Sequence, residues 1–411
     1  MFTIHKYEKM SYQIILRANI TIEVENCNFR TITFLFLYAL KDLFQEYVSK
    51  VLLHYFEEKY ENMDLAKLLG VRIVKKKTTK RTTKFKTLFG SILVPQIQVR
   101  VVDFEGKKRQ MSITRLLLGV SPMFQIPDFM KEIVAWIGSV STFRVGHNII
   151  GILSNFKCSL MSVWNSVQWG ASRIKLELSP EGTDETQADG TGIPTIKTGK
   201  RGSELKKIFQ IKRDGKLHLI GMSIGKYKSV SDWKSIVSEP LLAIINQFGR
   251  VFVGTDGDKS IIESVLSLSE KVKIQFDIWH VFHQMKYYLW ADGLAKDSRS
   301  KIIAHFYKKA MLLKCSAKKR DYFIRRYISL LASGGLSKTA TYLKSSMTYF
   351  YTHEKEGNST LYTTKTERSM RTTNQRINVG VWSDSGALNV AKIRDAYYYN
   401  GISPLNWKNR A

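Results

Sequence analysis

Two apolar periodicities alternate through the central part of the chain. Runs in which every second residue is apolar predict strands, and runs with apolar residues three or four apart predict helices. The Asp214-Gly215 pair between two such strands is a strong hairpin signal. A polar stretch that ends at Asp189 is interpreted as the first strand. The predicted elements are, in order, strands at 184–188, 207–212 and 216–224, a helix at 233–248, a strand at 251–254, a helix at 260–268 and a strand at 272–276.

Carboxylates follow three of these predicted strands, namely Asp189, Asp256 and Asp277. Active sites of α/β sheets lie at the carboxyl ends of the strands, so we expect these side chains at one edge. Asp258 is expected to cap the following helix instead. The order of the elements is that of an RNase H-like domain. The fold class that we expect is therefore α/β, with an RNase H-like mixed-sheet catalytic core, and a generic α/β domain is the alternative.

The segments that flank this core have mostly helical patterns. Residues 281–351 carry no strand signal and predict an all-α insertion, in which Trp290 is expected in the core, with stacking on a base as the alternative. Residues 128–174 show a helix-turn-helix pattern, for which an ordinary αα-hairpin is the alternative. We expect a basic N-terminal region with a long helix at 34–60 and a small β element (1–126), a helix-turn-helix DNA-binding domain (127–178), the first part of the core (179–285), the all-helical insertion (286–354), and the closing helix of the core with a C-terminal tail (355–411).

Positive charge dominates the composition. The 411 residues include 64 Lys and Arg against 35 Asp and Glu, a net charge of +29. Such an excess favours a polyanionic partner, and nucleic acid is favoured over an anionic membrane because no basic amphipathic helix or lipidation motif is evident. The longest apolar run, at 34–40, is too short to span a bilayer. We expect double-stranded DNA as the partner, and no membrane.

The three cysteines, Cys27, Cys158 and Cys315, are far apart in the sequence. Because they form no Cys-x-x-Cys pair, neither a disulfide framework nor a zinc knuckle is indicated. The N-terminus shows no signal-peptide pattern. We therefore expect an intracellular protein, cytoplasmic and associated with the nucleoid.

Two segments carry the residues that we expect to contact DNA. Between residues 71 and 118, 13 Lys and Arg stand against two acids, which favours a phosphate-contacting surface over a merely solvated one. The cations that we assign to it are Lys75, Lys76, Lys77, Lys80, Arg81, Lys84 and Lys86. In the helix-turn-helix pattern the second helix would read base edges. Its candidate readers are Ser162, Asn165 and Gln168.

The acids Asp189, Asp256 and Glu367 are the candidate catalytic residues. Mg²⁺ prefers oxygen ligands, and two such ions held by carboxylates can activate a water or a 3′-hydroxyl and stabilise the leaving oxygen of a phosphodiester. One Asp at a strand end is more often a turn or cap residue, but three acids in a basic chain favour a Mg²⁺ site, with Mn²⁺ as a substitute. Glu185 is the alternative first acid, because residues 184–188 are polar for a central strand.

Other residues could assist this site. Asp277 and His280 lie at one strand-to-helix turn, where they either fix the turn by a hydrogen bond or act as an accessory pair. Arg371 follows Glu367 by one helical turn and could hold its carboxylate or a phosphate. The same predicted helix adds two cations that we expect beside the metal site, Arg368 and Arg376.

Four motifs together resemble the DDE transposases of Mutator-like elements and related prokaryotic insertion sequences. They are Asp189-Gly-Thr, Thr255-Asp256-Gly, Asp277-x-x-His280 and Glu367-Arg-x-Met-Arg, with helices between the last two. The resemblance covers residues 130–396 and implies an RNase H-like core with an all-α insertion between the second Asp and the Glu.

By this likeness Asp189, Asp256 and Glu367 are the metal-binding triad, and Asp277 and His280 form the accessory motif. The implied activity is cleavage and strand transfer at the ends of a mobile element, with terminal inverted repeats and target DNA as substrates. Such transposases act as assemblies that hold two ends, so a homodimer or higher assembly is expected. The alternatives are a noncatalytic DNA-binding factor derived from a transposase and a structure-specific nuclease on the same core.

Overall fold

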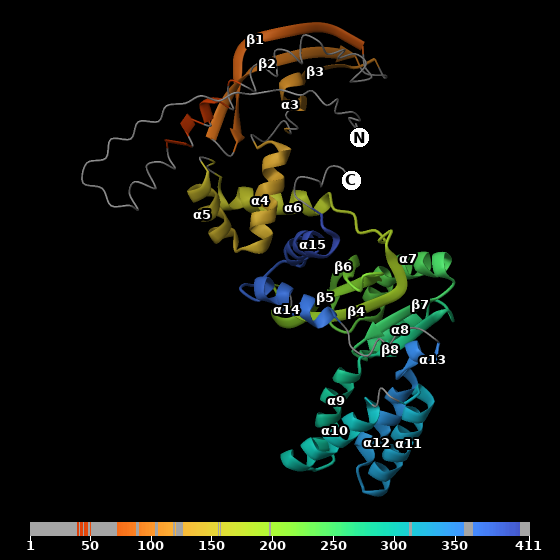
Figure 1. Cartoon of the computed structure of the whole chain (residues 1–411). Coiled ribbons are helices and arrows are strands. Elements are labelled where there is room, and N and C mark those ends of the chain that lie inside the picture. Colours follow the sequence, from red (N-terminus) through yellow and green to blue (C-terminus); the bar gives the residue numbers. More distant parts are fainter. Residues whose placement is uncertain are drawn as a thin grey trace, which may run out of the picture. The chain divides into compact units, whose positions relative to one another are not determined.

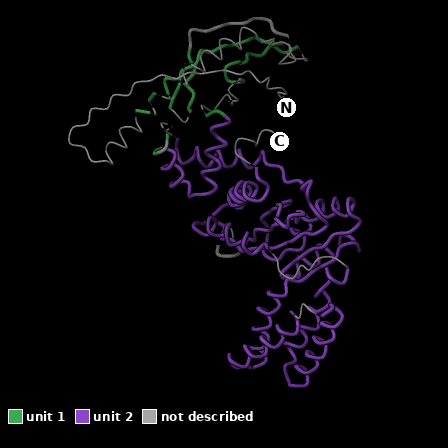
Figure 2. Tube along the Cα trace, in the orientation of Figure 1, with its two compact units in different colours: residues 1–127, 151–157 green, residues 128–150, 158–411 purple. Residues whose placement is uncertain are grey.

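The chain divides into two compact units, residues 1–127 with 151–157 and residues 128–150 with 158–411 (Figure 2). The computed structural model describes residues 72–87, 90–102, 106–117, 120, 126–154, 156, 158–196, 199–311, 315–356 and 365–402, and part of 39–50. The long helix predicted at 34–60 lies largely outside the described residues, and those described between 39 and 50 are helical.

The first unit contains a three-stranded antiparallel sheet in the order β1-β2-β3. Its elements are β1 (Arg72–Thr87), β2 (Gly90–Val102), β3 (Lys108–Ser112) and the short helix α3 (Ile113–Leu117). Alternate apolar positions give this sheet one buried face, formed by Phe85, Ile92 and Val94 together with Val120. The small β element is confirmed, and the basic block 75–86 lies within its first strand.

A mixed five-stranded sheet forms the centre of the second unit (Figure 1). Its strands are β4 (Gly182–Thr195), β5 (Gly199–Lys212), β6 (Leu217–Lys226), β7 (Val251–Thr255) and β8 (Val272–Phe276). Their order is β6-β5-β4-β7-β8, antiparallel among the first three and parallel from β4 to β8. The hairpin predicted at Asp214-Gly215 is confirmed, with Gly215 in the left-handed region at φ 76°.

Helices cover both faces of this sheet. On one face Ala188 and Ile208 pack with α7 (Val230–Phe248) and α8 (Lys259–Leu266). On the other face Ile193 and Leu205 pack with α14 (Thr366–Ile377) and α15 (Asp384–Asn400). Consecutive residues of the central strands are therefore buried in turn on opposite faces, which explains why β4 and β5 do not show a clean apolar-polar alternation.

Between β8 and α14 the described residues form helices, as the sequence predicts. These are α9 (Ile278–Ala291), α10 (Lys296–Ala310), α11 (Ala317–Ser333), α12 (Ser337–Ser346), the 3₁₀ turn η1 (Met347–Tyr349) and α13 (Thr352–Lys355). Asp292 caps α12, since its carboxylate accepts hydrogen bonds from the backbone of Lys338 (3.1 Å) and Thr339 (2.9 Å). The expected core position of Trp290 is wrong, because its side chain is 65% exposed on α9.

The helices α4 (Asp128–Val140), α5 (Phe143–Leu153) and α6 (Leu160–Ser172) come directly before the five-stranded sheet in the sequence. The Ser159 hydroxyl caps α6 by accepting a hydrogen bond from the Ser162 backbone at 3.1 Å. Apolar residues of α4 and α6 share a core with α15, built from Ala135, Val167, Ala171, Ile174, Val390, Ile393, Ala396 and Ile402. In the part of the chain that the structure describes, no helix is long and apolar enough to cross a membrane.

Candidate active site

Asp256 directly follows β7, as the sequence predicts. Its Oδ1 accepts a hydrogen bond from the backbone N–H of Asp258 at 3.0 Å, which fixes the carboxylate at the strand end. Asp258 itself caps α8, because its Oδ1 accepts from the backbone of Ser260 at 2.7 Å. The intervening Gly257 has φ 93°, a conformation that L side chains rarely adopt. The two neighbouring acids therefore have different roles, and the predicted cap is confirmed.

Asp189 lies within β4, so its expected place at a strand end is wrong. Pairing of β4 with β7 stops at Gln187, opposite Gly254, while pairing with β5 continues and sets Asp189 opposite Lys207. β4 therefore continues beyond Asp189 while paired with β5 alone. Two residues beyond Gln187 and Gly254, the parallel register sets Asp189 level with Asp256. The two acids thus come from adjacent strands, as the sequence predicts.

Burial raises the pKa of Asp189 to about 7, and the negative charge of Asp256 adds to this rise. The backbone N–H of Gly190, which donates to Asp189 Oδ1 at 2.7 Å, acts in the opposite direction. The Thr366 hydroxyl and the Lys207 ammonium also lower this pKa. The Asp189 and Asp256 carboxylates repel each other when both are ionised. A cation bound between them would therefore be strongly favoured.

One open cavity of about 650 Å³ brings the predicted catalytic acids together. Its lining includes Asp189, Asp256 and Glu367, and also His280 and Arg371. Glu367 comes from the first turn of α14, where its side chain is 66% exposed and lies 3.6 Å from Arg371. Residues from separate segments of the chain therefore line one hollow beside the β4–β7 edge.

The donor chemistry of this cavity suits Mg²⁺, which prefers oxygen ligands and commonly takes one or two protein carboxylates together with phosphate oxygens. The raised pKa of Asp189 supports this assignment, because a cation between Asp189 and Asp256 would relieve their repulsion. Among the described residues, no three His, Cys, Asp or Glu side chains stand close enough together to hold a metal ion. Glu367 would have to turn from Arg371 to become a third ligand.

Sequence reasoning missed Lys207, which is fully buried opposite Asp189. Its ammonium lies 2.5 Å from the Asp395 carboxylate and donates to the Thr373 hydroxyl at 2.6 Å and to Ser369 at 3.3 Å. Burial lowers the pKa of Lys207, while Asp395 acts in the opposite direction. Lys207 therefore joins β5 to α14, the helix that carries Glu367. The only sequence signal was a pair of adjacent lysines, Lys206 and Lys207, at the start of the strand predicted at 207–212.

The alternative first acid, Glu185, has a different partner. Its Oε1 lies 2.8 Å from Nε2 of the buried His353, away from the cavity lining. Asp277 caps α9, since its side chain accepts from the backbone of Trp279 at 2.9 Å. His280 Nε2 lies 3.9 Å from Asp277 and faces the cavity. Asp277 thus fixes the strand-to-helix turn by a hydrogen bond, as one of the two alternatives expected, while His280 lines the cavity.

Two of the residues assigned to DNA contact are instead hydrogen-bonded to other parts of the protein, Gln168 half-buried and Arg376 buried. Gln168 accepts a hydrogen bond from Asn389 of α15, and its amide nitrogen is buried, so it is not presented to base edges. Arg376 is 4% exposed and donates to the carbonyl of Gly138 at 3.1 Å. Burial lowers the pKa of Arg376 to about 10. Both expectations are wrong because closure of α14 and α15 over α4 and α6 covers these side chains.

The remaining DNA candidates stay predictions. Asn165 and Arg368 are exposed, and Ser162 is partly exposed. In the first unit Lys84 is exposed and Lys86 half-buried. The other five cations of the basic block lie on β1, and their side chains lie outside the described residues: Lys75, Lys76, Lys77, Lys80 and Arg81.

The raised pKa of Asp189 predicts a pH-dependent loss of stability without metal. The folded state keeps this proton up to about pH 7, while an Asp in the unfolded chain loses it near its ordinary pKa of 3.8. Stability should therefore fall as pH rises from about 4 to 7, by at most about 4 kcal/mol from this group. Asp189→Asn should remove that fall, measured as melting temperature in EDTA from pH 5 to 8. Asp214→Asn, at an exposed turn, is the control; equal pH slopes in wild type and Asp189→Asn would contradict the assignment.

The sequence was also compared with known proteins. No protein-family model matches the chain, and no curated protein gives a significant match.

Proposed function

We propose that this protein is a DDE-type DNA transposase, which binds the ends of a mobile element and catalyses metal-dependent cleavage and strand transfer. The observation that carries the proposal is the shared cavity of Asp189, Asp256 and Glu367. The first two acids lie level on adjacent parallel strands, and the third begins a helix that packs on β4. Such a group of acids suits phosphodiester chemistry better than a binding role alone.

The topology supports the proposal. Numbered along the chain, the five strands have the spatial order 3-2-1-4-5, with an antiparallel hairpin at one side. This is the order expected of an RNase H-like core. The helices α9 to α13 lie between the second acid and the third in the sequence, as in the family that the motifs resemble.

The chain's own residues would have separate roles in this chemistry. Asp189, Asp256 and Glu367 would hold divalent ions, which when bound would activate the attacking water or 3′-hydroxyl and stabilise the leaving oxygen. Arg371, released from Glu367, would be available to a phosphate oxygen. His280 faces the same cavity and could donate a hydrogen bond to the substrate. Lys207 would keep α14 and therefore Glu367 in position.

The basic first unit is proposed to hold DNA through its phosphates. Replacing the seven assigned cations of the block 75–86 with Gln should weaken DNA binding and flatten its dependence on salt. If each cation contacts one phosphate, the slope of log K against log salt should decrease by about 0.9 per residue. Filter binding between low and high salt measures this slope. Replacement of the seven exposed Lys and Arg residues on α10 and α11 is the control, and an unchanged slope in the block variant would reject this surface.

A noncatalytic DNA-binding factor is the second candidate. One observation favours it: Glu367 is paired with Arg371, so the acids are not gathered as a complete ligand set. Cleavage of a labelled duplex separates the two candidates. The transposase requires cleavage in Mg²⁺ or Mn²⁺ that EDTA abolishes, followed by joining of the freed 3′ end to target DNA. The second candidate requires binding with no cleavage in either metal. A homodimer or higher assembly on DNA remains part of the first proposal.

A further inference from the structure

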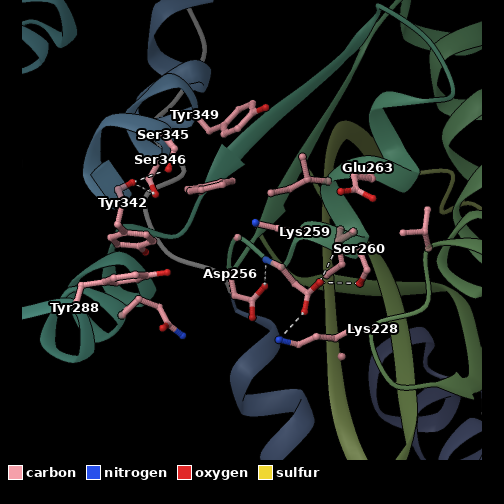
Figure 3. A pocket seen from close by; sticks show the side chains of 18 of the residues that line it. Lys228, Asp256, Lys259, Ser260, Glu263, Tyr288, Tyr342, Ser345, Ser346 and Tyr349 are labelled. Atoms are coloured by element: carbon pink, nitrogen blue, oxygen red, sulfur yellow. Dashed lines mark hydrogen bonds and ion pairs between the residues drawn. The ribbon is translucent and has the colours of Figure 1, made fainter. Parts of the chain in front are cut away.

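A second and larger cavity, of about 1280 Å³, adjoins the candidate active site. It lies between the sheet with its loops on one side and α9 and α12 on the other (Figure 3). Gly190, Thr191 and Asp256 line both cavities, so the two are continuous around the acid. We call the larger cavity the tyrosine cleft, after Tyr288, Tyr342 and Tyr349 in its wall.

Aromatic rings form the helical wall of the tyrosine cleft. Tyr288 of α9 and Tyr342 of α12 stack with ring centres 4.4 Å apart and planes 15° apart. Tyr288 is 38% exposed, and Figure 3 shows both rings on the same side of the cleft, across from Lys259 and Lys228. In the same cavity the ring of Tyr349 packs on that of Phe276, with ring centres 4.8 Å apart. A flat partner could therefore add to a stack that already exists.

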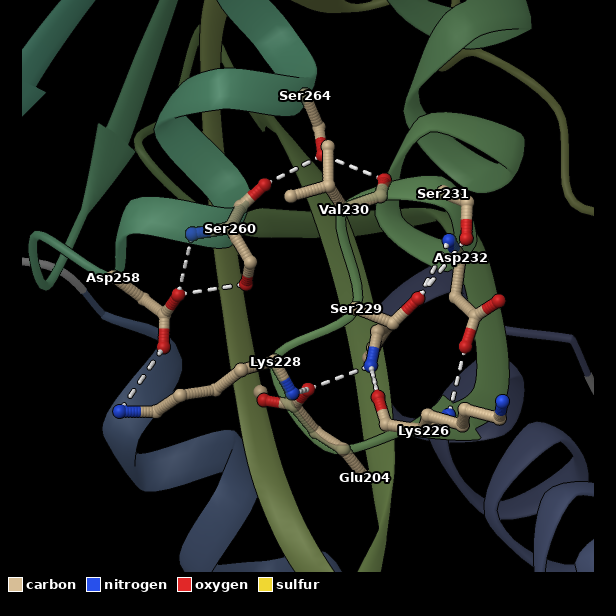
Figure 4. Close-up of polar contacts among 12 residues, drawn as sticks. Glu204, Lys226, Lys228, Ser229, Val230, Ser231, Asp232, Asp258, Ser260 and Ser264 are labelled. Atoms are coloured by element: carbon tan, nitrogen blue, oxygen red, sulfur yellow. Dashed lines mark hydrogen bonds and ion pairs between the residues drawn. The ribbon is translucent and has the colours of Figure 1, made fainter.

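The opposite wall carries two exposed lysines, Lys228 and Lys259. The Lys228 backbone N–H donates to Glu204 Oε2 at 3.0 Å, and this residue has φ 55°, so the loop is held in an uncommon conformation (Figure 4). The Lys228 ammonium is 58% exposed and lies 3.9 Å from Asp258. Glu204 is itself neutralised by the buried Lys206 at 2.6 Å. Lys259, at the first turn of α8, is exposed in the same wall.

We propose that the tyrosine cleft binds a single-stranded segment of DNA, with bases stacked on Tyr288 and phosphates beside Lys228 and Lys259. This inference rests on the proposed function, because a DNA strand bound in the cleft would place one of its phosphates in the cavity of Asp189, Asp256 and Glu367. At about 1280 Å³ the cleft exceeds the range of about 300–1,000 Å³ common for small-molecule sites. Bases of a duplex are already stacked on one another, so the exposed ring of Tyr288 selects an unpaired strand.

The charges of the cleft limit how this binding can work. The lining of the cleft carries no net positive charge, because four acids stand against three lysines: Glu204, Asp256, Asp258 and Glu263 against Lys228, Lys259 and Lys338. Stacking should therefore contribute more than phosphate contacts to affinity in the cleft. This separates it from the basic block 75–86, where charge should dominate. The strand in the cleft should accordingly bind with a weak dependence on salt.

The test is binding of a fluorescein-labelled oligothymidylate of about 12 nucleotides, in EDTA and with excess unlabelled duplex to occupy other basic surfaces. Tyr288→Ala should weaken binding by about 10-fold, and Tyr288→Phe, which keeps the ring, should bind as wild type does. Tyr322→Ala is the matched control, because Tyr322 is a 60% exposed tyrosine on α11 outside the cleft. Equal affinities of Tyr288→Ala and Tyr322→Ala would overturn the proposal.

A second measurement uses the wild-type chain and does not depend on how the variant folds. An oligonucleotide carrying 5-iodouracil should crosslink to Tyr288 or Tyr342 on irradiation, as located by peptide mass spectrometry. Crosslinks confined to other parts of the chain would overturn the proposal. Because both experiments are done in EDTA, they do not depend on cleavage. Binding in the cleft without metal-dependent cleavage would reject the proposed function and leave the strand-binding site standing.

Discussion

Asp256→Asn is expected to lower the rate of metal-dependent strand cleavage by at least about 1,000-fold, while the protein stays folded. The amide keeps the shape of the side chain and can still accept the hydrogen bond from the Asp258 backbone. It removes one of the two charges that would hold a divalent ion. It also removes the negative charge that helps to raise the pKa of Asp189, so that pKa should fall. Asp189→Asn and Glu367→Gln should lose cleavage similarly.

The matched control is Asp258→Asn, two residues away. Asn caps helices as well as Asp does, so α8 should remain intact and cleavage should stay within about threefold of wild type. The rates are measured as nicking of an end-labelled duplex in Mn²⁺, with melting temperatures recorded for every variant. Cleavage by Asp256→Asn at the level of Asp258→Asn would remove Asp256 from the proposed site.

Lys207→Met is expected to destabilise the protein by about 3–5 kcal/mol, because it leaves the Asp395 carboxylate buried without its cation. Asp395 is 2% exposed and shares the Lys207 ammonium with Thr373 of α14. Loss of this contact should also loosen α14, which carries Glu367. Cleavage should therefore fall at temperatures where the variant is still folded. Urea unfolding and the nicking assay measure the two effects.

Two comparisons isolate this buried pair. Lys216→Met removes an exposed lysine whose ammonium lies 2.9 Å from Asp214, and it should destabilise the protein far less than Lys207→Met does. Lys207→Met combined with Asp395→Asn removes both charges and should recover most of the lost stability. If Lys207→Met is no more destabilising than Lys216→Met, the buried pair does not stabilise the fold as argued.

The periodic parts of the fold could be predicted from the sequence because their signals are local. The Asp214-Gly215 turn, the helix that ends at Gly249 and the strand before Asp256 all follow from patterns within a few residues. The positions of Asp256 and Asp277 at strand ends followed with them. The helical segment after β8 was equally predictable, because it combines helical periodicity with an absence of strand signals.

The sequence predictions that proved wrong concern features that depend on contacts between distant segments. Asp189 looked like a strand end, but β4 continues because β5 pairs with it as far as Thr195. Arg376 of α14 was predicted to be a surface cation, but its guanidinium is buried against the rings of Phe143 and Trp382. The stack of Tyr288 on Tyr342 joins residues from two helices, and no local pattern indicates which helices meet. Periodicity determines which face of an element is apolar but not which partner covers it.

End joining by the wild-type protein is the decisive assay for the proposed transposase activity. A labelled duplex that carries the DNA flanking the gene is incubated with a supercoiled target plasmid in Mg²⁺ or Mn²⁺, with EDTA as the control. We expect cleavage at the element end and covalent joining of its 3′-hydroxyl to the plasmid, only when metal is present. Cleavage of any duplex without joining would instead indicate a nuclease. Tight binding without cleavage in either metal would contradict catalysis by Asp189, Asp256 and Glu367.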